Sequence, residues 1–479
     1  MILRVINHPY EFDMKNLCIT FFPHEKIRLE GEEDPVVVTT RRETDGSFFV
    51  SAKVYDVYRE TTAKPEPADE EHLVLSVTLY RLLSGILGFA PPWGVLYGVR
   101  PAKLMHRLCA KMGDDAAVAH FQTAFLTQKS KAELAHEVML HENRSIARSG
   151  PKSFSLYVSI PFCPTRCAYC SFVSHSIEKT HKLMTPYVDL LLRELEETSK
   201  YAKELGLELA TVYFGGGTPT TLSAQDLGRI FSTIEQNFDL SHLMEYTVEA
   251  GRPDTVTRER LEVIRAAGVQ RISINPQSFN DKVLEAIGRR HTAQQTLDAF
   301  ALARDCGFDH INMDFIAGLP EDDLPSFQRS IQTALDLQAE SITVHTLALK
   351  TSAYMVTREQ TFDLKDRLTV SNMVDYAGQT LHGAGYYPYY MYRQSKSLGN
   401  LENVGWCKPG YDCLYNVYMM DETHTVLAVG AGAVTKLRGQ NSGMIERIYN
   451  YKYPYEYIRD FDTLLERKKR IPGFYAEYD

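Results

Sequence analysis

Residues 155 to 347 alternate between short apolar runs and longer amphipathic segments, and this alternation is the strongest constraint on the fold. The runs are rich in Val, Ile, Phe and Tyr, as strands are, whereas the segments between them have helical spacing. Successive strand, helix and strand form a right-handed unit with parallel strands. The pattern predicts an α/β fold with a partial (β/α)6 barrel. The expected strands are Leu156–Ile160, Thr211–Phe214, Tyr246–Glu249, Arg271–Asn275, His310–Ile316 and Ser341–His345, and the expected helices lie near 184–205, 223–237, 257–267, 292–306 and 325–338.

The ends of these expected strands carry the residues that suggest chemistry. In a barrel of parallel strands the active site lies at the carboxyl ends of the strands, so we expect residues that directly follow the strands to meet in one pocket. In chain order these residues are the motif Cys163–Cys170, the run Gly215–Thr220, Glu249, Gln277, Asp314 and His345.

Three cysteines, Cys163, Cys167 and Cys170, form a C-x3-C-x2-C motif after the first strand. Thiolates at this spacing fit a loop around a soft metal centre, and three of them leave one iron of a [4Fe–4S] cluster open for another ligand. The alternative is a structural zinc ion with His175 or a distant cysteine as the fourth ligand. The chain lacks the second C-x2-C pair that is typical of such zinc sites. Five further cysteines have no assigned role: Cys18, Cys109, Cys306, Cys407 and Cys413.

Two further blocks flank the barrel, so we expect an N-terminal α+β domain over 1–150, the barrel over 151–347 and a mixed C-terminal domain over 348–479. In the first block, Trp93-Gly94 and Arg100-Pro101 stand near a turn, which is either a structured loop or a contact for a partner or substrate. The expected N-terminal strands are Ile2–Ile6, Leu17–Phe22, Val36–Thr40 and Phe48–Tyr55, and the expected helices lie around 70–88, 101–128 and 131–148.

The C-terminal block is dense in tyrosine, with one group over 386–392 and another over 449–457, and we expect a helix around 366–383. The run Val429-Gly430-Ala431-Gly432-Ala433 indicates a place where two backbone segments approach closely.

The charge and hydropathy of the chain exclude several classes of function. The formal net charge is -9 and the sequence pI is about 6.0, which argues against an overall electrostatic grip on nucleic acid or on an anionic membrane. The longest apolar stretch, Leu73–Tyr97, is interrupted by Arg81 and by Pro91-Pro92. The first residues lack a basic segment followed by an apolar one, which is the mark of a secretory signal. We therefore expect a cytoplasmic protein without nucleic-acid or membrane partners.

Several of these motifs together resemble the radical S-adenosylmethionine (SAM) superfamily: Tyr157–Cys163, the C-x3-C-x2-C loop with Tyr169 before its last cysteine, and Gly215–Thr220. Within the superfamily, the chain is similar to the oxygen-independent coproporphyrinogen III oxidases, and its first and last blocks are most similar to HemZ-type coproporphyrinogen dehydrogenases. The resemblance implies a radical SAM barrel with a [4Fe–4S] cluster on Cys163, Cys167 and Cys170 and with SAM as the second cofactor.

The same resemblance implies roles for the residues at the strand ends. Gly216, Gly217 and Thr218 would contact SAM and its amino group, and Glu249 would lie beside SAM, unless it is a solvated residue at a strand end. Tyr157 would pack near the sulfonium, unless it is a core residue of its strand.

Four further residues match cofactor-binding positions of the family. Tyr169 and Gln277 are two of them. Arg289 is the third, and it could instead belong to a surface basic cluster with Arg290 and His291. Asp314 would bind ribose hydroxyls or a second SAM, or it could be a capping or core polar residue. No catalytic residue can be named.

The resemblance further implies a reaction. The family removes hydrogen from two propionates of coproporphyrinogen III and releases carbon dioxide, which gives the vinyl groups of protoporphyrinogen IX in anaerobic heme biosynthesis. This requires a tetrapyrrole substrate, an electron donor and an electron acceptor. The alternatives are a heme chaperone and a radical SAM enzyme that methylates heme or opens its ring.

Two departures from the family pattern point in opposite directions. Phe172 stands where the best-known decarboxylating members have a fourth cysteine, which favours the chaperone branch. The stretch Leu414–Met419 lacks the histidine and tryptophan of the His-Asn-x-x-Tyr-Trp heme motif of that branch, which argues against it.

A flat tetrapyrrole with anionic arms needs aromatic walls and a few cationic or amide groups. The tyrosines of 386–392, followed by Arg393, Gln394 and Lys396, have this composition. The alternative is an aromatic packing face on a small sheet.

Overall fold

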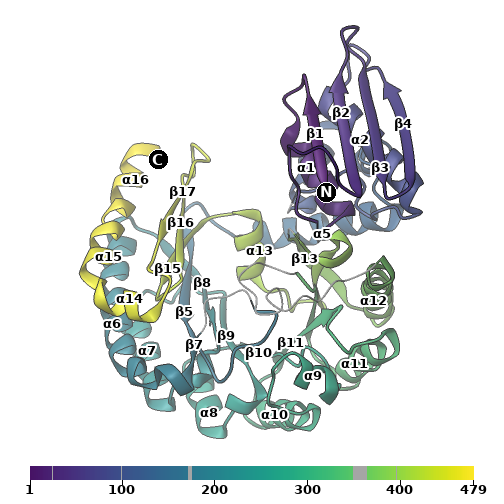
Figure 1. Cartoon of the computed structure of the whole chain (residues 1–479). Helices are drawn as coiled ribbons and strands as arrows, with labels where there is room; N and C mark the ends of the chain where they lie inside the picture. The colour runs from purple at the N-terminus through teal and green to yellow at the C-terminus, as the bar shows by residue number, and fades with distance from the viewer. Residues whose placement is uncertain (24, 99, 171–174, 349–363, 395) are drawn as a thin grey trace.

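The computed structural model describes residues 1–23, 25–98, 100–170, 175–348, 364–394 and 396–479. Its centre is a sheet of 11 strands, six of which run parallel in the order in which they occur along the chain. These six match the strands that the sequence predicts, and they form the curved wall at the centre of Figure 1. They are β5 (Ser153–Ile160), β8 (Glu208–Gly216), β9 (Glu245–Gly251), β10 (Arg271–Ile274), β11 (His310–Ala317) and β12 (Ser341–Thr346).

Helices cover the outer face of this wall, as the predicted crossover units require (Figure 1). Most of these helices have a polar N-cap residue. The side chains of Ser223, Thr257, Thr292 and Asp323 each accept a hydrogen bond from a backbone amide of the first turn. The helices are α6 (Ile177–Glu204), α7 (Ala224–Asn237), α8 (Arg258–Ala266), α10 (Ala293–Asp305), α11 (Leu324–Asp336) and α12 (Leu364–Gly383). The short helix α9 (Asp281–Ala286) is not among the predicted ones.

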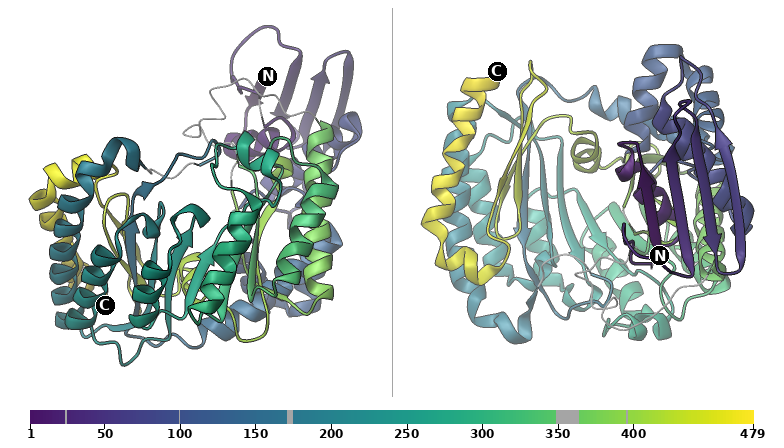
Figure 2. Two further views of the ribbon diagram at one scale, coloured as in Figure 1. Left: turned by 90° about the horizontal axis from the view of Figure 1, so that it is seen from below. Right: turned by 45° about the horizontal axis from the view of Figure 1, so that its top comes forward.

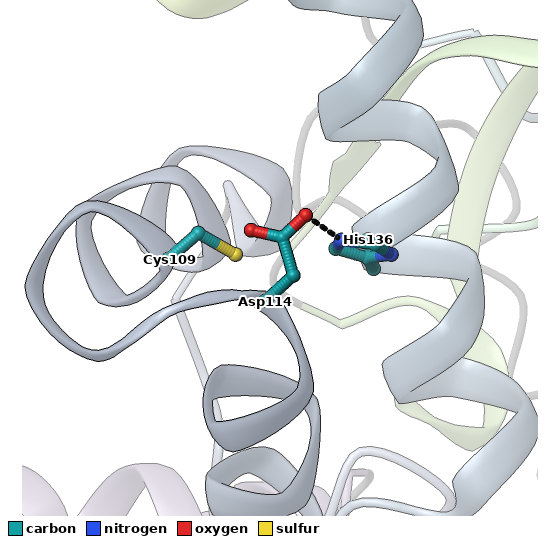
Figure 3. Close-up of side chains that lie close together, drawn as sticks. All are labelled: Cys109, Asp114 and His136. Carbon is teal, nitrogen blue, oxygen red and sulfur yellow. Dashed lines mark hydrogen bonds and ion pairs between the residues drawn. The ribbon is translucent and has the colours of Figure 1, made fainter.

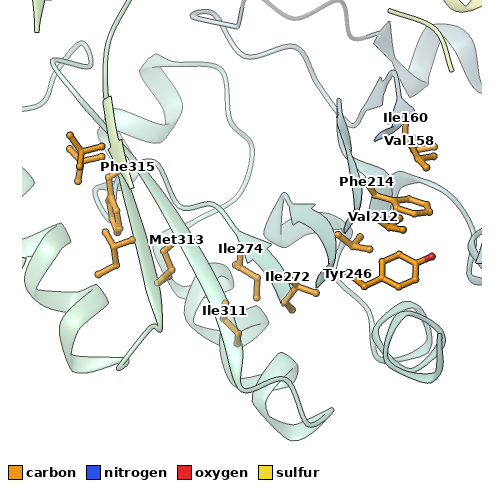
Figure 4. Packing of buried hydrophobic residues seen from close by; sticks show 14 of the residues in the cluster. Val158, Ile160, Val212, Phe214, Tyr246, Ile272, Ile274, Ile311, Met313 and Phe315 are labelled. Atoms are coloured by element: carbon orange, nitrogen blue, oxygen red, sulfur yellow. The ribbon is translucent and has the colours of Figure 1, made fainter. Parts of the chain in front are cut away.

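Alternation along each strand separates an apolar outer layer from a polar interior. Figure 4 shows the outer layer, in which strand residues such as Val158, Phe214 and Ile272 pack toward the helices. Their neighbours Tyr157 and Ser273 point the other way and line a cavity inside the curve of the sheet. The same periodicity therefore builds the core and places the polar candidates inside the barrel.

Among the described residues the sheet does not close on itself, and C-terminal strands extend it at both edges. At one edge β14 (Glu402–Cys407) pairs antiparallel with β12, followed by β13 (Tyr387–Arg393). At the other edge β15 (Thr425–Val429) pairs parallel with β5, followed by β16 (Val434–Arg438) and β17 (Ile445–Tyr449). The partial barrel of the predicted fold class is thus confirmed, whereas the three domain boundaries stay predictions.

The N-terminal block forms a separate sheet with its own apolar core. Strand β1 (Ile2–Ile6) pairs parallel with β2 (Val36–Arg42), and β3 (Phe48–Val54) and β4 (Val57–Ala63) follow antiparallel. The predicted strand Leu17–Phe22 is wrong, because Leu17 to Phe21 belong to helix α1 (Glu11–Phe21). Met14, Leu17, Cys18 and Phe21 are buried at helical spacing, and a parallel β1–β2 pair needs a crossover between its strands.

Helices link this block to the barrel: α2 (Glu71–Leu87), α3 (Pro101–Met112), α4 (Asp114–Thr123) and α5 (Lys129–Ile146). Helix α5 packs on β13. The N-terminal sheet and the C-terminal helices α14 (Pro454–Arg459), α15 (Phe461–Lys468) and α16 (Arg470–Tyr478) lie at opposite ends of the barrel sheet (Figure 2). No helix among the described residues is long and apolar enough to cross a membrane.

Candidate active site

A cavity of about 570 Å³ lies inside the curve of the barrel sheet. Every residue that the family resemblance assigns to the cluster or to SAM lines it, from the first strand unit to the fifth. They are Tyr157, Cys163, Cys167, Tyr169, Cys170, Gly216, Gly217, Thr218, Glu249, Gln277, Arg289 and Asp314. The volume is within the usual range of about 300–1,000 Å³ for small-molecule sites.

The cysteine loop follows β5 and begins at the short strand β6 (Phe162–Cys163). Its sulfurs have hydrogen-bond donors nearby: the hydroxyl of Thr218 donates to Cys163 Sγ at 3.5 Å, and Arg252 Nη1 donates to Cys167 Sγ at 3.8 Å. The amide of Ala168 donates to the carbonyl of Ile287 at 2.9 Å. Donors of this kind stabilise thiolates, so the loop is suited to sulfur ligands in their charged form.

The glycine loop lies directly against the cysteine loop. The amides of Gly217 and Thr218 donate to the carbonyls of Ile160 and Phe162, each at 2.7 Å. A Cβ atom on Gly217 would lie 2.6 Å from the carbonyl oxygen of Phe162 and 3.0 Å from Cys163 Sγ. The glycine therefore permits a close approach that brings backbone groups to the cavity beside the cysteines.

Glu249 is a carboxylate inside the barrel rather than a solvated residue at a strand end. The hydroxyl of Tyr213 donates to its Oε1 atom at 2.6 Å. Burial raises the pKa of Glu249 to about 7, against the opposing effect of the Tyr213 hydrogen bond. A positively charged ligand beside Glu249 would stabilise the ionised carboxylate, because its charge replaces the stabilisation that solvent gives an exposed carboxylate.

Asp314 lies across the cavity and is held in its charged form. Burial alone would raise the pKa of Asp314, but His345 and the side-chain amide of Asn312 outweigh burial and keep it below its ordinary value. Asn312 Nδ2 donates to Asp314 Oδ1 at 2.8 Å. The backbone of Gln277 adjoins this strand, since its amide donates to the carbonyl of Asp314 at 2.9 Å.

Arg289 is 8% exposed and does not belong to a surface cluster, unlike its exposed neighbour Arg290. Its Nη1 atom donates to the carbonyl of Asn275 at 2.6 Å, and Nη2 donates to the hydroxyl of Tyr169 at 3.2 Å. Burial opposes its charge, but Tyr169 and Cys167 together keep the pKa of Arg289 above its usual value. The guanidinium thus offsets negative charge at the cysteine loop.

Tyrosine rings form part of the cavity wall. Tyr213 stacks on Tyr415 with ring centroids 4.4 Å apart, and Tyr157 lies nearly parallel to both. On β13, Tyr390 and Tyr392 stack at 6.3 Å and also line the cavity. Flat apolar faces with hydroxyl edges suit an aromatic or tetrapyrrole ligand.

The tyrosine-rich segment fills both of its predicted roles, because some of its residues form a ligand wall and others an aromatic packing face. Tyr390, Tyr392 and Gln394 line the cavity, whereas Tyr389 is buried in an aromatic cluster. Arg393 faces away from the cavity and donates to the carbonyls of Leu96 and Asn400. Arg393 is therefore a structural residue rather than a ligand-binding cation.

Several cavity residues escaped prediction. Arg252 is buried, forms an ion pair with Asp254 at 2.8 Å and reaches the cysteine loop. Its position three residues after Glu249, at the end of β9, is the signal that could have identified it. Arg271, at the start of β10, is also buried, and among the described residues its two terminal nitrogens have no hydrogen-bond partner.

The structure bears on one of the two departures from the family pattern and leaves the other without an account. Position 172 lies outside the described residues, so Phe172 has no structural account. The stretch Leu414–Met419 belongs to helix α13 (Leu414–Asp421), which presents Tyr415, Asn416 and Met419 to the cavity.

Another group of possible metal ligands lies outside the cavity. Within the described residues, Cys109, Asp114 and His136 have ligand atoms within 4.8 Å of one another (Figure 3). Asp114 is exposed and accepts a hydrogen bond from His136 at 3.0 Å, which accounts for this surface pair without a metal.

Comparisons with known proteins agree with this geometry. The sequence model of the radical SAM superfamily matches residues 157–334. The chain is 34% identical over 470 residues to the oxygen-independent coproporphyrinogen-III oxidase-like protein HemZ of Bacillus subtilis, with 95% of this chain and 94% of the relative covered. It is 31% identical over 318 residues to the heme chaperone HemW of the same organism, with 64% of this chain and 79% of the relative covered.

A solved structure with a similar fold is the coproporphyrinogen III oxidase HemN from Escherichia coli, a radical SAM enzyme. The TM-score is 0.51 at 22% sequence identity, and the match covers 68% of this chain and 72% of the other.

Proposed function

The chain belongs to the radical SAM superfamily and, within it, to the family of oxygen-independent coproporphyrinogen III oxidase-like proteins, and on this premise we propose that it converts coproporphyrinogen III to protoporphyrinogen IX by oxidative decarboxylation. A [4Fe–4S] cluster and SAM are the cofactors of the superfamily. One observation carries the proposal: residues from five successive strand units, separated by more than 150 positions in the chain, line one cavity together with a wall of tyrosines.

The donor set fits both cofactors. Cys163, Cys167 and Cys170 would hold the cluster, with the donors of Thr218 and Arg252 on two of the sulfurs. Gly216, Gly217 and Thr218 would present backbone groups to SAM. When bound, the reduced cluster and SAM supply a carbon radical that removes one hydrogen atom from a substrate propionate.

Polar residues on the other strands would orient SAM. Glu249 would accept hydrogen bonds from the SAM amino group, which also stabilises its charged form despite a pKa of about 7. Asp314 is held charged and would accept hydrogen bonds from the ribose hydroxyls, with Gln277 beside it. Arg289 would keep Tyr169 and the cysteine loop in place.

The substrate would lie against the tyrosines. Tyr213 and Tyr415 offer a stacked face, and Tyr390 and Tyr392 offer another. After hydrogen removal, each propionate loses carbon dioxide and one electron to become a vinyl group. The reaction therefore requires an electron donor for the cluster and an acceptor for the electron that the substrate gives up.

A heme chaperone is the second candidate, because HemW is similar to 64% of the chain. The stretch Leu414–Met419 lacks the histidine and tryptophan of the heme motif of the chaperone branch, which weighs against this alternative, and of the usual axial ligands of heme iron it keeps only tyrosine and methionine.

The test is an anaerobic assay with the reconstituted protein, SAM, a low-potential reductant, coproporphyrinogen III and an added electron acceptor. We expect 5′-deoxyadenosine, carbon dioxide and a divinyl product. Cys163→Ala should remove both cluster and SAM cleavage, whereas Cys306→Ala, outside the cavity, should keep both. Tight one-to-one heme binding without any decarboxylated product would overturn the proposal in favour of a chaperone.

A further inference from the structure

A second group of charged side chains surrounds the carboxylate of Glu422, which directly follows helix α13. Arg100 Nη1 lies 2.5 Å from this carboxylate, Arg447 Nη2 3.1 Å, Lys103 Nζ 3.6 Å and Lys436 Nζ 3.7 Å. We call these five residues the Glu422 cluster. Four cations share one carboxylate, so the cluster carries more positive charge than its own acid can balance.

The acidic residues next to the cluster do not cancel its excess of positive charge. Burial and the nearby Asp421 raise the pKa of Glu142 to about 8, so that this carboxyl group is largely neutral at pH 7. Asp421 is another acid beside the cluster in the described part of the chain, and its backbone carbonyl accepts a hydrogen bond from Lys103 at 2.5 Å. Four positive charges against two negative ones leave a net excess of two, beside a chain whose formal net charge is -9.

The Glu422 cluster adjoins the cavity through α13 and β16. Lys436 Nζ donates to the carbonyl of Met419 at 3.2 Å, and Met419 and Met420 line the cavity. Val434, two residues before Lys436 on β16, lines it as well, so both side chains leave the same face of the strand.

Different parts of the chain supply the cations. Lys436 and Arg447 are direct neighbours across the β16–β17 pair. Arg100 and Lys103 come from the start of α3, so the N-terminal block contributes to the same cluster. Of these side chains, Arg100, Lys103 and Arg447 are 29%, 40% and 42% exposed, which leaves them accessible to a ligand.

We propose that the Glu422 cluster binds a ring carboxylate of the tetrapyrrole that occupies the cavity, and this inference rests on the proposed function. Because its net charge is negative, the chain as a whole repels an anionic ligand, and cations at the binding site must offset this repulsion. Arginine guanidinium groups and lysine ammonium groups are the usual partners of carboxylates. Glu422 occupies the cations in the absence of ligand and competes with the ligand carboxylate for them.

A purely structural cluster, which only fastens α3 to the C-terminal strands, makes a different prediction. If the cluster is structural, Glu422→Gln removes the partner of four cations and lowers stability without a gain in binding. If the cluster binds carboxylates, the same change removes a competitor and strengthens the binding of an anionic ligand.

The experiment titrates the full-length reconstituted protein with coproporphyrin III, the stable oxidised tetracarboxylic acid, and with its uncharged tetramethyl ester. We expect Lys436→Met and Arg447→Gln each to weaken coproporphyrin III binding about tenfold, the scale of one lost charge-assisted contact. Glu422→Gln should strengthen it several-fold, and raised salt should reduce these differences. Arg470→Gln is the control, because Arg470 pairs with Glu446 and Glu477 rather than with Glu422.

The outcomes separate this inference from the proposed reaction. If the unmodified protein binds coproporphyrin III and both Lys436→Met and Arg447→Gln bind it equally well, the role of the cluster is refuted while the reaction stands. Weaker binding by Glu422→Gln, together with a lower melting temperature, would refute it in favour of a structural cluster. If the unmodified protein neither binds coproporphyrin III nor decarboxylates its reduced form, the proposed function and this inference both fail.

Discussion

At the scale of single residues, glycine is required at positions 216 and 217 of the cavity loop for different reasons. Gly216 has a φ of +102°, which side chains other than glycine rarely adopt, whereas Gly217 is constrained by its surroundings. We expect Gly217→Ala to lower the iron bound after reconstitution and to weaken SAM binding at least tenfold, because its Cβ would push on Phe162 and on the sulfur of Cys163. Iron analysis and SAM titration measure these effects.

The matched control is Gly228→Ala on α7, where the nearest atom to an added Cβ lies 3.7 Å away. It should bind iron and SAM like the unmodified protein. Normal iron content and normal SAM affinity in Gly217→Ala would contradict the close approach of the two loops.

Glu249 predicts a dependence of stability on pH in the cluster-free protein. Its folded pKa of about 7 lies above the ordinary 4.5, so the native state holds an extra proton between these values. The free energy of unfolding should therefore fall as pH rises through this window, by up to about 3 kcal/mol from this group alone. Glu249→Gln should lack that part of the decrease.

Urea unfolding at pH 5 and pH 8 measures the difference, with Glu262→Gln as the control because Glu262 is exposed on α8. An equal decrease in the unmodified protein and in Glu249→Gln would show that the carboxyl group is not buried as described.

The sequence predicts much of the cavity because motifs at strand ends converge in a barrel whatever their separation in the chain. It did not identify Arg252, Arg271 or Tyr415 as cavity residues. Their partners come from other strands, as with Arg252 and the sulfur of Cys167, and no spacing along the chain records such a contact. The place of Glu422 beside four cations depends in the same way on side chains of α3, β16 and β17 that meet at the end of α13.

At the scale of elements, hydrophobic periodicity predicted the barrel strands well and failed where composition and period disagree. Leu17–Phe22 is rich in β-branched and aromatic residues, yet its buried positions have helical spacing once Met14 is included. Helix α9 spans Asp281–Ala286 and is too short to give a periodic signal. Tertiary packing decides such short segments.

The run that begins at Gly430 is a close backbone approach, as its sequence predicts: an added Cβ would lie 2.5 Å from both the carbonyl of Ser159 and the hydroxyl of Tyr187. Next to it, Glu194 on α6 is fully buried, accepts a hydrogen bond from the amide of Gly430 at 2.7 Å and forms an ion pair with Lys468 Nζ at 2.6 Å. This ion pair ties α6 to the turn after β15 and to α15.

We expect Glu194→Ala to lower the free energy of unfolding by about 3–5 kcal/mol, because it leaves the ammonium of Lys468 buried without its counter-charge. The control on the same helix is Glu197→Ala, whose exposed pair with Lys200 should contribute within about 0.5 kcal/mol. Denaturant unfolding compares the two variants. Similar losses for both would show that the Glu194 network is not essential to the fold.

At the scale of the whole molecule, the placement of the C-terminal strands could not be predicted from sequence. Strands β13 and β14 extend one edge of the barrel sheet, and β15, β16 and β17 extend the other. The choice of edge depends on pairings between residues far apart in the chain, such as Thr425 with Phe154 and Ser341 with Cys407. No local pattern along the chain records such pairings.

The junction between the N-terminal block and the barrel contains a buried charge pair. Glu402 on β14 is 1% exposed and accepts hydrogen bonds from Lys131 Nζ and from Trp93 Nε1, each at 2.7 Å. Burial opposes its charge, but Lys131 and Trp93 keep the pKa of Glu402 below its ordinary value. Trp93 is thus part of a structured loop, the first of the two alternatives that its sequence context allows.

A double-mutant cycle tests this junction. Lys131→Met should lower the free energy of unfolding by about 3–5 kcal/mol, because Glu402 stays buried and charged without its cation. Adding Glu402→Gln should restore part of the loss, since a neutral amide no longer needs the cation, and the coupling between the two changes should exceed about 1 kcal/mol. Urea unfolding measures each variant. Purely additive losses would show that the two side chains do not interact, and that the N-terminal block is held to the barrel by its apolar contacts alone.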